Sequence, residues 1–249
     1  MNQAPAPTHG TAGAPTRSVT ICRVVGIPIR VHWTFAFLVG LVLVADWDTS
    51  ASVKAEGFLW IAALFVCVIV HEISHCLVAR RRGADVVDIL LLPIGGMSEL
   101  TSTPEAPGDE FAIAIVGPLT SLALGALFAA GGLLLGARMW PPTLFAGSWW
   151  ARLTWLNLVL GAFNLLPAMP MDGGRALRAV LARKGSRLGA THAAARVTRV
   201  IGTFMVVTGL FFDIWLMVIG LFVLLGSAGE EEAARHPSDH GIGHGDPSP

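Results

Sequence analysis

The chain has 249 residues, of which 53% are hydrophobic and 14% are charged, whereas about 25% of the residues of a soluble domain are charged. Its 17 acidic and 17 basic residues give a formal net charge of zero, which excludes a general nucleic-acid binder, and the apolar composition excludes a disordered chain. Three cysteines do not make a disulfide scaffold. The composition therefore predicts a polytopic membrane protein.

The two ends of the chain differ in composition from its middle. Residues 1–19 are rich in Pro, Ala, Thr and Gly, and residues 229–249 are acidic and then rich in His, Gly and Pro, so both are predicted to be disordered tails. No signal peptide is predicted, because the first apolar run starts late and no small-residue cleavage site follows it. The core is predicted to occupy residues 20–228.

Long apolar stretches in this core predict about six transmembrane helices, since a spanning helix needs about 20 mostly apolar residues. Asp213 is predicted to form a tight turn between the last two. The predicted spans are Val31 to Asp46, Gly57 to about Ala79, Phe111 to Ala137, Leu153 to Met171, Thr191 to Phe212, and Ile214 to Ser227.

Basic residues favour one side of this six-span arrangement. Arg80, Arg81 and Arg82 follow the second span, and seven further Lys or Arg residues lie between the fourth and fifth, whereas the opposite loops hold only Lys54 and two arginines. Because loops rich in Lys and Arg stay in the cytoplasm, we expect a multi-pass protein of the plasma membrane with both termini cytoplasmic.

Two segments are typical of strands rather than helices. Residues 83–100 are β-branched and apolar, with a bend expected at Pro93 to Gly96, and residues 20–30 alternate around a turn that begins at Gly26. We expect them to pair as a small sheet at the cytoplasmic rim. The overall prediction is an all-α membrane protein with this sheet added.

The second span contains the sequence His71-Glu72-Ile73-Ser74-His75. Residues i and i+4 share a face of a helix, so both imidazoles can reach one metal ion, and Glu72 lies close enough to reach a water molecule on that ion. Polar groups inside an apolar span are costly and are functional by default. A chance occurrence is the alternative, and the position within a span disfavours it.

A catalytic zinc ion usually has three protein ligands, so a third is needed. Asp172 is the favoured candidate, because Gly173 and Gly174 allow close approach of the backbone and the preceding prolines break the fourth helix. The alternative is that Asp172 caps the helix that follows it.

These residues are similar to motifs of the site-2 protease family of intramembrane zinc metalloproteases. The resemblance covers residues 20–227, and its beginning is similar to the branch that usually carries a pair of CBS domains; neither a CBS pair nor a PDZ domain is expected in this chain. The matching segments are His71-Glu72-x-x-His75, Asn164-x-x-Pro167-x-x-Pro170-x-Asp172-Gly173, Pro93-Ile-Gly95-Gly96, Gly117-Pro118-Leu-Thr-Ser121 and Gly26-Ile-Pro-Ile-Arg-Val-His32-Trp33.

The resemblance implies a role for each matching residue. His71, His75 and Asp172 become the ligands of one Zn²⁺ per chain, and Glu72 becomes the catalytic general base. Asn164, Gly95 and Gly96 become substrate-binding residues.

The implied activity is hydrolysis of a peptide bond in or near a transmembrane segment of a membrane protein, such as an anti-sigma factor or a membrane-associated precursor. We expect the strand at residues 88–94 to hold the unwound substrate by strand addition.

Three other interpretations stay open. A different membrane protease with the same histidine motif takes a Glu as its third ligand, but no Glu occurs between Glu110 and Glu230. A metal transporter would place acids or histidines across several spans. An inactive metal-binding scaffold would more often have lost Glu72.

Overall fold

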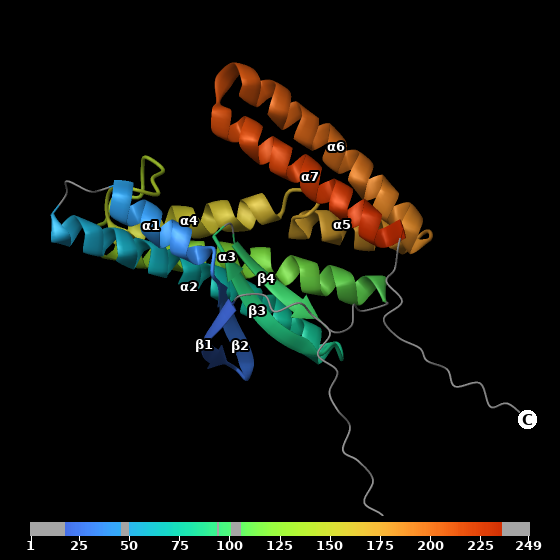
Figure 1. Ribbon diagram of the computed structural model, residues 1–249, viewed down its shortest axis with the longest axis horizontal. Helices are drawn as coiled ribbons and strands as arrows, with labels where there is room; N and C mark the ends of the chain where they lie inside the picture. The colour runs from blue at the N-terminus through green and yellow to red at the C-terminus, as the bar shows by residue number, and fades with distance from the viewer. Residues whose placement is uncertain (1–17, 46–49, 94, 101–105, 236–249) are drawn as a thin grey trace, which may run out of the picture.

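The computed structural model describes residues 18–45, 50–93, 95–100 and 106–235. Helices predominate in this part of the chain, and a four-stranded sheet lies beside them (Figure 1). Most of the two predicted tails, residues 1–17 and 236–249, lies outside the described residues. The first strand and the last helix nevertheless extend a few residues into the ranges that were predicted as tails.

Each of the six predicted spans contains a helix. The fourth differs most from the prediction: it begins earlier, where the Ser148 hydroxyl accepts a hydrogen bond from the amide of Ala151, and it ends before Pro167. The elements are β1 (Ser18–Val24), β2 (Ile27–His32), α1 (Phe35–Ala45), α2 (Ala51–Arg81), β3 (Val86–Leu92), β4 (Gly95–Leu100), α3 (Pro107–Leu134), α4 (Trp149–Asn164), α5 (Asp172–Ala182), α6 (Arg187–Phe212) and α7 (Ile214–Arg235).

Three of the described helices, α2, α3 and α6, are long and apolar enough to cross a membrane. The apolar part of α7, Ile214–Gly229, is shorter. Asp213 alone separates α6 from α7 and its carboxylate accepts hydrogen bonds from the amides of Trp215 and Leu216, which confirms the predicted tight turn. The helices are those of a multi-pass membrane protein, and the count of six spans stays a prediction.

The sheet has the order β1-β2-β3-β4 and joins the two segments that were predicted to pair. β2 and β3 are parallel, with Ile29 opposite Ile89, and the other neighbours are antiparallel. The expectation that residues 88–94 offer a free edge to a substrate is wrong, because β3 is hydrogen-bonded to β2 on one side and to β4 on the other. The edge of the sheet on this side is β4.

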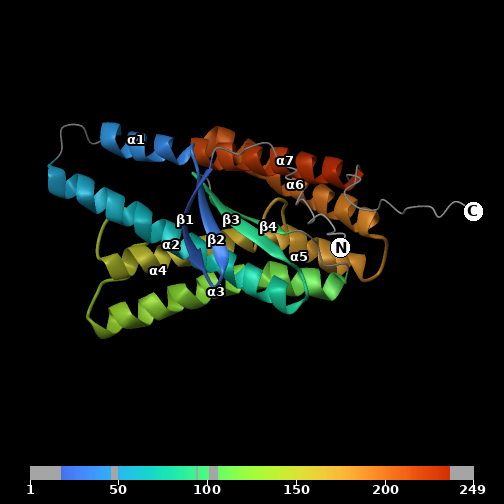
Figure 2. The ribbon, with the colours of Figure 1, turned by 60° about the horizontal axis from the view of Figure 1, so that its bottom comes forward.

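The sheet packs against α2 through an apolar core. Ile29 and Ile89 of the sheet are fully buried with Phe65 and Cys76 of α2, so Cys76 has a packing role. α3 in turn packs against α2, α4 and α5, while α6 and α7 form an antiparallel hairpin (Figures 1 and 2). α3 is therefore the helix that joins α2, with its histidine motif, to α5.

Candidate metal centre

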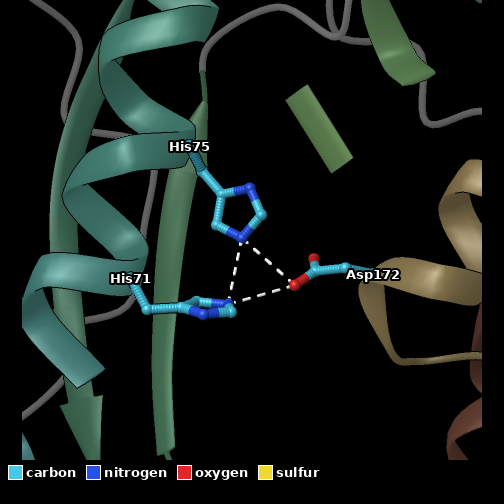
Figure 3. A group of neighbouring side chains, drawn as sticks. All are labelled: His71, His75 and Asp172. Carbon is cyan, nitrogen blue, oxygen red and sulfur yellow. Dashed lines mark hydrogen bonds and ion pairs between the residues drawn. The ribbon is translucent and has the colours of Figure 1, made fainter. Parts of the chain in front are cut away.

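The histidine motif of α2 faces the beginning of α5 (Figure 3). The Nε2 atoms of His71 and His75 are 3.1 Å apart, and each lies 3.1 Å from Oδ2 of Asp172. All three residues are buried. The structure thus brings together the three side chains that were predicted as metal ligands, from positions about a hundred residues apart in the sequence.

The second nitrogen of each imidazole is held by α3. Nδ1 of His75 lies 2.6 Å from the carbonyl oxygen of Ile113, and Nδ1 of His71 lies 2.9 Å from the hydroxyl of Ser121. A carbonyl oxygen only accepts hydrogen bonds, so Nδ1 of His75 carries the proton and the lone pair of Nε2 faces the other two ligands. Such an outer hydrogen bond is the usual support of a metal-binding histidine.

Asp172 is the first residue of α5, and Met171 occupies the N-cap position. The Asp172 carboxylate is directed at the two imidazoles, with Nη1 of Arg175 3.8 Å from its other oxygen. The side chain therefore presents a carboxylate oxygen to the same point as the two Nε2 atoms.

Close backbone contacts hold the segment that leads to Asp172. A Cβ atom on Gly173 would overlap the carbonyl oxygens of Leu165 and Leu166, and one on Gly174 would lie 2.6 Å from the amide nitrogen of Met169. This confirms that the two glycines let the backbone approach closely. The amide of Met169 also donates a hydrogen bond of 2.9 Å to the hydroxyl of Thr198 on α6.

Glu72 lies outside the three-residue cluster, against the backbone of β4. A Cβ atom on Gly96 would stand 2.6 Å from Cγ of Glu72 and 3.2 Å from its Oε1, so only glycine leaves room there for the carboxylate side chain. Gly95, the other predicted substrate residue of this pair, has a φ of +146°, which favours glycine. Asn164 is also outside the cluster, and its side-chain amide donates to the carbonyl of Leu160.

Gly117 and Ser121 were predicted only as part of a segment that matches the family, and the structure gives each a position at the cluster. A Cβ atom on Gly117 would overlap Nε2 of His75 and lie 2.8 Å from Nε2 of His71. Ser121 holds the outer nitrogen of His71. The sequence feature that could have indicated this role is the serine hydroxyl four residues after Gly117, within the apolar part of α3.

Comparison with known proteins identifies the family. A profile of Peptidase family M50 matches residues 59–147 and 142–209, a range that includes the histidine motif and Asp172. The chain belongs to this family. The match confirms the predicted resemblance, because site-2 proteases are members of family M50.

Individual M50 relatives agree with this assignment. The chain is 35% identical over 222 residues to a zinc metalloprotease of Methanocaldococcus jannaschii, over 88% of this chain and 62% of that protein. It is 32% identical over 235 residues to a Mycobacterium tuberculosis protein that carries a zinc-metalloprotease name, over 86% of this chain and 58% of that protein. The chain therefore spans less than two thirds of the length of these relatives.

A solved structure is also similar. The site-2 protease from Methanocaldococcus jannaschii matches with a TM-score of 0.63 and 34% sequence identity, over 86% of this chain and 95% of that one. The helices and the small sheet described above are thus an M50 fold.

Proposed function

We propose that the protein is an intramembrane zinc metalloprotease, which hydrolyses a peptide bond in or near a transmembrane segment of another membrane protein. The observation that carries the proposal is the buried convergence of two Nε2 atoms and one carboxylate oxygen at 3.1 Å from one another. Two imidazoles and a carboxylate are the donors of a catalytic zinc site that keeps a fourth position open. The donor set of His71, His75 and Asp172 fits one Zn²⁺ per chain.

The chemistry follows from the residues around that position. When bound, zinc lowers the pKa of a water molecule to about 7 and polarises the carbonyl of the substrate. Glu72 follows His71 directly on α2, and we assign it the role of general base. It would accept a proton from the attacking water and then donate that proton to the leaving amine. The close approach of Gly96 limits the space in which the Glu72 side chain can move.

The position of the cluster along α2 supports hydrolysis inside the membrane. His71 and His75 precede Arg81, the last residue of the helix, by about 15 Å and 9 Å at the usual helical rise. The arginines at this end mark the membrane interface. A substrate helix hides its carbonyls in its own hydrogen bonds, so it must unwind before it is cut at this depth.

The edge strand β4 is the place where we expect the unwound substrate to bind. β4 contains Gly95 and Gly96, lies beside Glu72 and is the edge strand of the described sheet, so a peptide can be added to it as a further strand. Asn164 ends α4 just before the segment that leads to Asp172, and we assign it a hydrogen bond to the substrate backbone.

The same proposal includes the arrangement in the membrane. We expect six spans in the plasma membrane, with the basic residues after α2 and those between the fourth and fifth spans on the cytoplasmic side together with both termini. A substrate with one transmembrane segment, such as an anti-sigma factor or a membrane-associated precursor, would reach the cluster from within the bilayer.

The competing functions are less well supported. Among the described residues, His71, His75 and Asp172 are the single group of three metal-ligating side chains close enough to share an ion, whereas a metal transporter needs successive sites. An inactive scaffold gives no reason for a glutamate between the two histidines.

The experiment that tests the proposal compares wild-type protein with Glu72→Gln. Fragments of membrane proteins are measured by proteomics in cells that express each form, and the zinc content of each purified protein is determined. We expect both to hold about one zinc, and the variant to cut about 100- to 10,000-fold more slowly, because the metal ligands remain and the base does not. Turnover close to that of wild type would exclude Glu72 as the base.

A further inference from the structure

Charged side chains from three other elements contact the first turn of α3. Arg82, directly after α2, pairs with Asp109, and Arg178 of α5 pairs with Glu110. Arg187 at the beginning of α6 lies 3.8 Å from the second carboxylate oxygen of Glu110. The proposed mechanism uses none of these residues.

The Glu110–Arg178 pair is the most buried of these contacts. Nε of Arg178 donates to Oε1 of Glu110 over 2.7 Å, and the two side chains are 12% and 6% exposed. Charged groups this deeply buried are tolerated only when paired, and loss of one partner leaves an uncompensated charge. The pair therefore strongly favours one arrangement of α5 against α3.

The two helices that the pair joins both contribute to the metal centre. Glu110 lies one turn before Ile113, the residue whose carbonyl holds His75, and the same helix continues to Gly117 against both imidazoles. Arg178 lies less than two turns after Asp172 on α5. A shift of α5 along α3 would therefore move the Asp172 carboxylate relative to histidines that α3 itself holds.

We propose that the Glu110–Arg178 ion pair positions Asp172 within ligand distance of His71 and His75. Both are positioning residues, because neither belongs to the group of three side chains that could hold the metal ion. The proposal rests on the proposed function only in taking the cluster as a zinc site. It assigns a functional consequence to a contact that would otherwise stabilise only the fold.

The test measures metal binding rather than proteolysis. Full-length protein is purified as wild type, Glu110→Gln and Arg178→Gln, and its zinc affinity is measured by competition with a chelator. We expect each variant to bind zinc on the order of tenfold more weakly, within the range for loss of an outer support of a metal ligand. The absorption spectrum of the Co²⁺-loaded protein should change as well, because the carboxylate ligand is displaced.

Arg152→Gln is the matched control. Arg152 on α4 is also a buried arginine paired with a glutamate, Glu56 in the N-terminal part of α2, and its guanidinium stacks on Trp60 of α2 and Trp149 of α4. Loss of this pair should lower thermal stability while the zinc affinity and the Co²⁺ spectrum stay those of wild type. An equal loss of zinc affinity in this control would overturn the proposal, since general destabilisation would then explain every variant.

Further variants and outcomes decide the proposal. The double variant Glu110→Gln/Arg178→Gln should be no weaker in zinc binding than the worse single variant, because the same interaction is lost once. Single variants that bind zinc as tightly as wild type, with an unchanged Co²⁺ spectrum, would overturn the positioning role. If Arg178→Gln does not fold, Arg178→Lys keeps the charge with a shorter reach and is expected to bind zinc with intermediate affinity. Wild-type protein without zinc affinity would instead refute the proposed function itself.

Discussion

The metal centre has two halves, the histidine pair and Asp172, and different physical causes position them. His71 and His75 are four residues apart on a continuous helix of 31 residues, and helical geometry alone places both on one face. Asp172 follows a non-helical segment after α4, and its position depends on the packing of that segment against other elements. One half is local in origin and the other is tertiary.

This difference indicates where the centre is vulnerable. Any state in which α2 is helical keeps the two imidazoles together, so changes elsewhere affect them mainly through α3. Asp172 is held by Gly173 and Gly174 against the preceding backbone, by Thr198 of α6, and by α7, where a Cβ atom on Gly226 would lie 2.6 Å from Cδ of Pro170. Substitutions far from Asp172 in the sequence should therefore weaken the centre.

Removal of a ligand should have the largest effect. His71→Ala, His75→Ala and Asp172→Ala should each reduce zinc affinity by more than about 100-fold, the upper end for loss of an outer support, and should abolish proteolysis. Zinc content and cleavage of a membrane-protein substrate are the measurements. The two halves contribute equally if the three losses are similar. Zinc binding by Asp172→Ala as tight as that of wild type would place the third ligand elsewhere.

Gly117→Ala tests how the local half depends on α3. The added methyl group would overlap Nε2 of His75, so an imidazole must move and zinc affinity should fall on the order of tenfold, as for loss of an outer support. Gly125→Ala, two turns further along the same helix, is the control: its methyl group would meet the side chain of Leu158 at 3.0 Å and the backbone nitrogen of Leu158 at 3.3 Å, and no residue of the metal centre. Equal zinc affinities in the two variants would show that the imidazoles tolerate the contact.

The sequence was sufficient wherever a periodic pattern or a short motif determined the structure. The apolar runs predicted helices at all six places, and the spacing of His71 and His75 predicted their shared face. The pairing of residues 20–30 with residues 83–100 was also predicted, because the first segment alternates like a strand and the second is β-branched and apolar. The helices and the shared face depend on residues close in the sequence, and the strand pairing depends on two segments that each have the pattern of a strand.

The order of strands and the contacts of α3 were not predictable in this way. That β3 is an interior strand depends on which partner occupies each of its edges, and alternation alone does not encode this. Gly117 and Ser121 have a spacing that close helix packing explains equally well, so their contact with the histidines appears only when α2 and α3 are placed together. The joining of Glu110 to Arg178 is likewise a tertiary feature.

Thr198→Val should have the smallest effect and tests the tertiary half alone. The Thr198 hydroxyl accepts the amide hydrogen of Met169 and donates to Ala194, and valine has nearly the same shape without either bond. The Met169 amide is then buried without a partner, which costs about 1–3 kcal/mol. We expect lower thermal stability and a loss of zinc affinity smaller than that of Gly117→Ala.

Thr191→Val on the same helix is the control for this prediction. It removes only a hydrogen bond to the carbonyl of Arg187 in its own helix and should leave zinc affinity unchanged. Thr198→Ser, which keeps the hydroxyl, should restore both properties. If Thr198→Val and Thr191→Val bind zinc equally well, α6 does not position Asp172, and the glycine contacts within the segment are sufficient to hold it.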